Sequence, residues 1–165
     1  MNQSTDRIEK EIVLRAPQER VWRAISDVVR FGDWFGMELD GAFVPGARLS
    51  GRLKPTTVDP GVAEMQRKHA GIPVSFFVER VEPMTLLSYR WHPFALDPQA
   101  DYSNEPMTLV TFTLEPVDGG TRLRVVESGF DSIPLERRAD SFEANSEGWA
   151  VQMQLVQKYL SLERV

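Results

Sequence analysis

The chain has 165 residues, of which 42% are hydrophobic and 26% charged, a composition typical of ordinary globular proteins, and its net charge at pH 7 is −5. This acidic balance argues against a nucleic-acid-binding protein, which would carry a basic excess. The absence of cysteine excludes disulfides, thiolate nucleophiles and cysteine-ligated metal centres.

Targeting and membrane signals are also missing from the sequence. The N-terminus has no apolar core of a secretory signal, and no window approaches the roughly 18 consecutive apolar residues of a membrane-spanning helix. We therefore expect a cytoplasmic protein without membrane insertion. We expect one domain over residues 6–165, preceded by a flexible N-terminus at 1–5.

The first elements are a strand and two short helices. Residues 7–14 alternate apolar and charged side chains, which predicts a strand. Pro17 is typical of a first helical turn, and an apolar stripe at helical spacing follows from Val21 to Val28. We expect Gly32 to end this helix and residues 33–35 to form a second short turn.

A hairpin and a further short helix are predicted next. Residues 37–43 and 47–53 alternate around a turn at Pro45-Gly46. Asp59 followed by Pro60 is the pattern of an N-cap and a first helical residue, which indicates a helix near 60–69.

The second half contains strands followed by a long helix. The predicted strands are Val74–Val81, Leu86–Trp91, Thr108–Glu115 and Thr121–Ser128. Helical spacing then runs from about Pro134 to Leu162. Gly148 lies inside this helix at a cost of about 1 kcal/mol relative to alanine, which predicts a close backbone approach or a kink.

This order of elements predicts an α+β fold. Because only the last helix is long enough to cover the apolar face of the sheet, we expect a curved antiparallel β-sheet of about seven strands gripping a long C-terminal helix. Two short helices lie between strands 1 and 2.

These elements and several motifs resemble the START-like, helix-grip (SRPBCC) superfamily. Within it, the chain is similar to the bacterial family related to the C-terminal domain of the activator of heat-shock protein 90 ATPase. The matching features are IVLRAPQERVWRAISD, Trp34-Phe35, FFVERVEP, LSYRWHP, TLVTFTLEPVDGGTRLRVVESGF and Gly148-Trp149. The resemblance covers residues 7–163 and implies a cavity between sheet and helix, but such folds host unrelated activities.

The sequence departs from that family in three places. The separate N-terminal domain of the eukaryotic activator has no counterpart here, so a chaperone role is not expected to carry over. Glu127 stands where many relatives place a histidine, and the segment 54–71 is longer than a minimal hairpin turn.

Glu127 is the principal candidate for chemistry. The two-residue period of a strand places it on the same face as Leu123 and Val125, toward the helix or a cavity. A carboxylate there needs a partner or must stay protonated. It is a ligand anchor or a general base, or else the strand ends and Glu127 reaches solvent or a nearby arginine.

The inward aromatic positions predict either a ligand cavity or a solid core. Under the cavity hypothesis, the ligand-binding residues are Trp34, Phe76, Tyr89, Trp91, Phe112, Glu127, Phe130, Trp149 and Met153. Tyr89, Trp91 and Glu127 would supply its polar contacts.

The segment Ser88–Pro106 concentrates aromatic side chains and aspartates. With only two histidines in the chain and no paired spacing, we predict no metal site and no cofactor. We expect a stiff loop at the cavity mouth, with His92 and Tyr102 at its edge. The run Glu136-Arg137-Arg138 is interpreted as a solvated helix face.

Three hypotheses for function follow. The preferred one is binding of a small hydrophobic or aromatic molecule, such as a lipid, a polyketide or a phenolic compound. The second, drawn from the resemblance, is a cyclase or dehydratase in which Glu127 transfers protons, assisted by Tyr89 or His92; no other catalytic residue is assigned. The third is a chaperone- or stress-related interaction module, which needs an exposed apolar patch and is disfavoured by the charged outward positions. The sequence leaves open whether the protein forms a homodimer.

Overall fold

The computed structural model of the protein describes residues 6–97 and 99–162. The predicted flexible N-terminus at 1–5 therefore lies outside the described residues, as do position 98 and the last three positions. The elements, in chain order, are β1 (Arg7–Leu14), α1 (Gln18–Ser26), α2 (Val28–Phe35), β2 (Met37–Asp40), β3 (Arg48–Leu53), α3 (Pro60–Gln66), η1 (Arg67–His69), β4 (Pro73–Glu82), β5 (Leu86–Trp91), β6 (Thr108–Val117), β7 (Gly120–Ser128), η2 (Phe130–Ser132) and α4 (Leu135–Leu162).

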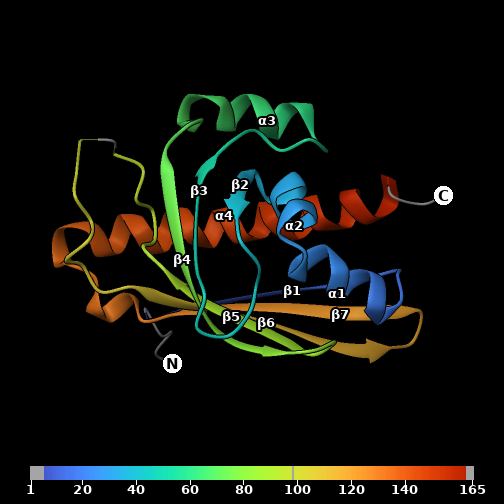
Figure 1. Cartoon of the computed structure of the whole chain (residues 1–165). Helices are drawn as coiled ribbons and strands as arrows, with labels where there is room; N and C mark the ends of the chain where they lie inside the picture. Colours follow the sequence, from blue (N-terminus) through green and yellow to red (C-terminus); the bar gives the residue numbers. More distant parts are fainter. Residues whose placement is uncertain (1–5, 98, 163–165) are drawn as a thin grey trace.

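The strands form one antiparallel sheet in the order β1-β7-β6-β5-β4-β3-β2. Figure 1 shows the long helix α4 crossing this sheet, with α1 and α2 beside the second half of the helix. α1 and α2 both pack against α4, and α1 also contacts β6 and β7. The predicted α+β helix-grip architecture is thus confirmed, including the two short helices between the first two strands.

The break between α1 and α2 differs from the sequence prediction. Asp27, rather than Gly32, separates the two helices, and its carboxylate caps α2 by accepting the backbone N–H groups of Val29 and Arg30. Gly32 lies inside α2. The position requires glycine because a Cβ there would come within 2.2 Å of the carbonyl oxygen of Met37. This glycine allows α2 to approach the start of β2.

The helix after Asp59 forms as predicted. The Asp59 carboxylate accepts the N–H groups of Gly61 and Val62, and Pro60 occupies the first helical position. None of the described helices is both long and apolar enough to cross a membrane.

Candidate ligand-binding cavity

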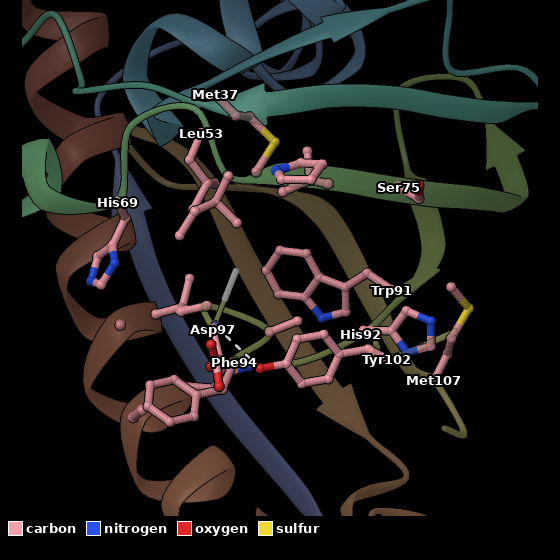
Figure 2. Close-up of a pocket in the computed structure, with 18 of the residues that line it drawn as sticks. Met37, Leu53, His69, Ser75, Trp91, His92, Phe94, Asp97, Tyr102 and Met107 are labelled. Atoms are coloured by element: carbon pink, nitrogen blue, oxygen red, sulfur yellow. Dashed lines mark hydrogen bonds between the residues drawn. The ribbon is translucent and has the colours of Figure 1, made fainter. Parts of the chain in front are cut away.

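A cavity of about 1030 Å³ opens at one side of the sheet and α4. Residues 92–97 and 99–107, which we call the mouth loop, line it together with residues of β3, β4, η1 and α4. Figure 2 shows Trp91 at its centre, with Leu53 on one side and Tyr102 on the other. The cavity therefore lies beside the sequence segment that concentrates aromatic side chains.

Strand register explains why there is space here. β3 pairs with β4 over Pro73–Phe77, whereas β5 pairs with β4 only from Phe77 to Glu82. The chain leaves the sheet after Trp91, so residues 73–76 of β4 have no paired strand on that side among the described elements. The mouth loop fills only part of this gap.

The cavity wall is largely aromatic and aliphatic. Phe77 and Phe94 remain 38% and 39% exposed although they are large apolar side chains, and both line the cavity. Polar side chains also line it, from β3, η1, the mouth loop and α4, and include Arg48, His69, His92, Asp101 and Gln152. An apolar wall with a few polar groups is the usual character of a small-molecule site.

Glu127 lies behind this wall, fully buried. Its Oε2 accepts the indole N–H of Trp91 at 2.8 Å and the Thr108 hydroxyl at 2.6 Å. Its Oε1 accepts the indole N–H of Trp149 at 2.8 Å and the side-chain amide of Asn145 at 2.9 Å. Four neutral donors from β5, β6 and α4 thus satisfy one carboxylate.

This arrangement differs from the alternative in which the strand ends and Glu127 reaches solvent or a nearby arginine. The carboxylate neither reaches solvent nor pairs with an arginine of the described chain, and it does not line the cavity. Its visible effect is to hold two indoles, Trp91 and Trp149, which do line the cavity. We describe Glu127 as a hydrogen-bonded hub that joins the sheet to α4.

Tyr89 lies in the packed interior beside this hub. Its ring stacks on Phe76 with centroids 4.1 Å apart, and its hydroxyl has no hydrogen-bond partner among the described residues. Burial raises the pKa of Tyr89 well above its usual value of 10.0, and the negative charge of Glu127 raises it further. The phenol is therefore held neutral.

Among the predicted ligand-binding residues, only Trp91 and Trp149 lie in the cavity wall. The remaining seven are buried and do not line it: Trp34, Phe76, Tyr89, Phe112, Glu127, Phe130 and Met153. Trp34, for example, donates its indole N–H to the Ala24 carbonyl at 2.8 Å.

The space directly between the sheet and α4 is filled by aromatic rings. The Trp149 ring lies 6.0 Å from that of Trp91 and 5.7 Å from each of the rings of Phe35 and Phe112. Because these rings fill the space between the sheet and α4, the cavity lies to one side of it, next to the mouth loop.

Sequence reasoning missed Arg137, which it interpreted as part of a solvated helix face. Its guanidinium, on the first turn of α4, donates to both carboxylate oxygens of Glu105 and to the carbonyls of Pro93 and Phe94. It also lies 4.7 Å from the ring centre of Tyr102. These partners belong to the mouth loop, 32 to 44 residues away, so no local spacing could have revealed them.

His92 is the first residue of the mouth loop and lines the cavity. Partial burial lowers the pKa of its imidazole below the usual 6.5. Glu105 and Asp101 oppose this shift, while the positive charge of Arg137 contributes to it. The described residues contain no cluster of histidine and acidic side chains able to hold a metal ion.

Comparisons with known proteins agree with this architecture. The chain is similar to protein MLL2253 from Mesorhizobium loti, with 27% identity over 96% of this chain and 99% of that one and a TM-score of 0.70. DynU16, from the dynemicin biosynthetic locus, is 23% identical over 94% of this chain but only 47% of its own, with a TM-score of 0.68. The Aha1 dimer from Colwellia psychrerythraea is 18% identical over 96% of this chain and 98% of that one, with a TM-score of 0.67.

The last two likenesses, under 25% identical, concern the fold alone. No curated protein matches the chain. The model of one protein family, the activator of Hsp90 ATPase homolog 1-like proteins, matches residues 15–161. Because this match spans nearly the whole helix-grip fold described above, the chain belongs to the activator of Hsp90 ATPase homolog 1-like family.

Proposed function

We propose that the protein binds a small hydrophobic or aromatic molecule, of the lipid, polyketide or phenolic class, in the cavity beneath the mouth loop. The observation that carries this proposal is the aromatic wall itself, where Trp91, Phe77 and Phe94 border a space of about 1030 Å³. Cavities for drug-sized ligands range from about 300 to 1,000 Å³. Burial of apolar ligand surface would supply affinity at about 25 cal/mol/Å².

The protein's own hydrogen bonds hold the wall in place, which favours binding. Trp91 and Trp149 are each fixed through their indole N–H on Glu127, so the partly exposed ring of Trp91 loses little freedom when a ligand packs on it. Arg137 fixes the mouth loop in the same way through its bonds to Glu105 and two carbonyls. Preorganised walls of this kind reduce the entropic cost of binding.

A proton-transfer enzyme has less support. A general base must reach the substrate proton, and Glu127 is fully buried behind the indoles with four donors already bound. Tyr89, suggested as its assistant, is equally buried and does not line the cavity. His92 is the only one of the three in the wall.

A chaperone cofactor, suggested by the family's description, also has less support. The outer face of the sheet carries cross-strand ion pairs, in which Arg122 contacts Glu11 and Glu115, and Arg124 contacts Glu9 and Glu11. Such compensated charges are unlike the apolar patch of a protein-docking surface. Stimulation of a chaperone ATPase by the purified protein would favour this role instead.

A cytoplasmic location and a homodimer complete the proposal. The solved Aha1 protein from Colwellia psychrerythraea is described as a dimer. Light scattering coupled to size-exclusion chromatography tests the dimer directly, and a monomer mass at micromolar concentration would contradict it.

The binding proposal is tested with Nile red, a neutral fluorescent probe with a flat fused-ring system. We expect saturable binding to the wild-type protein and a Kd about tenfold higher for Phe94→Ser, which removes apolar wall. Val29→Ser is the matched control, because Val29 is 67% exposed and lies outside the cavity. Absence of wild-type binding, or equal effects of the two substitutions, would overturn the proposal.

A further inference from the structure

Gly148 is a glycine that neither the backbone nor the packing of α4 requires. It is not among the glycines with positive φ, and apart from its chain neighbours and the local backbone of α4, no heavy atom of the described residues lies within 4 Å of its ideal Cβ position. The close approach predicted from the sequence is therefore not present. Gly32 and Gly120 differ sharply, since a Cβ at either would meet a carbonyl oxygen, at 2.2 Å and 1.9 Å respectively.

Gly148 is exposed, and the open space beside it adjoins the cavity. Gly148 lines it together with Asn145, Trp149 and Gln152, which follow the helical repeat on one face of α4. A side chain at position 148 would project from this face into the cavity. Glycine in a helix interior lowers the stability of the helix. The absence of a side chain at this position leaves free volume at the cavity wall.

We infer, on the basis of the proposed ligand binding, that Gly148 determines which ligands the cavity accepts, by letting a flat apolar molecule of more than one ring lie against the bare backbone of α4. A planar ring system can approach a helix closely only where no Cβ intervenes. Trp91, which is held by Glu127 and is partly exposed in the same cavity, offers an aromatic surface for offset or edge contacts. The cavity of about 1030 Å³ also exceeds what a single ring would fill.

The experiment compares two substitutions at Gly148 with two at Ala150. Gly148→Ala and Gly148→Leu place increasing volume in the cavity. Ala150 is exposed on the same helix and does not line the cavity, so Ala150→Leu and Ala150→Gly are the matched controls. Binding of Nile red, a large flat probe, and 2-naphthol, a smaller one, is measured by fluorescence titration, and Tm by circular dichroism.

At position 148, stability and binding should change in opposite directions. We expect Gly148→Ala to raise the Tm by about 2–4 °C while it weakens Nile red binding about threefold. Gly148→Leu should raise the Kd for Nile red about tenfold or more, and the Kd for 2-naphthol much less. Ala150→Gly should lower the Tm without changing either Kd, and Ala150→Leu should leave both Kd values unchanged.

The possible failures can be told apart. If wild-type protein binds neither probe, the proposed function fails and the role of Gly148 with it. If wild-type protein binds Nile red and both Gly148 variants bind it equally well, the role of Gly148 fails while the proposed function stands. Should Gly148→Leu not fold, Gly148→Ala decides alone, and an unchanged Kd for Nile red contradicts the inference.

Discussion

Trp91 on β5 and Trp149 on α4 donate their indole N–H groups to the same buried carboxylate, each at 2.8 Å. The acceptor, Glu127 on β7, thereby ties the sheet to the helix that it grips. The two rings lie 6.0 Å apart and continue into the wall of the cavity. One hydrogen-bonded hub therefore serves both the stability of the fold and the shape of the candidate site.

Replacing the Glu127 carboxylate with an amide should lower the stability of the protein. In Glu127→Gln the new NH₂ group faces donors whichever way the amide turns, because Trp91 and Trp149 occupy opposite oxygens. We expect a loss of about 2–4 kcal/mol in the free energy of unfolding, measured by urea denaturation. Thr108→Val, which removes one donor of four, should cost about 1–2 kcal/mol. Wild-type stability of Glu127→Gln would contradict the role of the hub.

Loss of Arg137 should loosen the mouth loop. Arg137→Met removes the bonds to Glu105 and to the carbonyls of Pro93 and Phe94. Chymotrypsin, which cleaves after aromatic residues such as Phe94 and Tyr102, should then cut the loop about tenfold faster. Arg138→Met is the control, because the Arg138 guanidinium donates to the Ile133 carbonyl instead. Equal cleavage of the two variants would show that Arg137 does not hold the loop.

The hydroxyl of Tyr89 should be dispensable at neutral pH and should matter in alkali. It is buried and has no hydrogen-bond partner in the part of the chain that the structure describes, so Tyr89→Phe should change the free energy of unfolding at pH 7 by less than about 1 kcal/mol, or increase it. The raised pKa means that the folded state keeps the phenol protonated, so the wild type loses stability as pH rises above about 10.

Tyr89→Phe should lose less stability over the same alkaline range. Urea denaturation at about pH 8, 10 and 11 measures the difference between the two proteins. Parallel losses in wild type and variant would show that Tyr89 ionises without penalty in the folded protein.

Through His92, the stability of the folded protein should fall slightly as the pH becomes acidic. Burial lowers the pKa of His92 below 6.5, so the folded state favours the neutral imidazole. Its contribution to stability is present above pH 6.5 and is lost as pH falls through the lower pKa of the folded state. An NMR titration should give a midpoint below 6.5, with the resonance assigned by its loss in His92→Gln. A midpoint above 6.5 would mean that Glu105 and Asp101 outweigh burial.

Much of the architecture could be predicted because local patterns encode it. Strand alternation placed Glu127 on the inner face with Leu123 and Val125, and all three are fully buried. The Asp59-Pro60 pair identified the start of α3, since an N-cap depends only on neighbouring N–H groups. The break at Asp27 was missed because the apolar stripe of α1 continues into α2, and only the capping geometry separates them.

Local patterns in the sequence were therefore enough to predict the helices and strands, their buried faces and the inward position of the Glu127 carboxylate. The hydrogen-bond partners of Glu127 depend on the tertiary structure, because Trp91 and Trp149 lie 36 and 22 residues from it along the chain. The tertiary structure likewise decided that Arg137 binds the mouth loop, and that the free space lies where β5 stops pairing with β4 rather than between the packed rings. Periodicity specifies which side of an element is buried, but only the packing of distant elements fixes which atoms meet and where a gap remains.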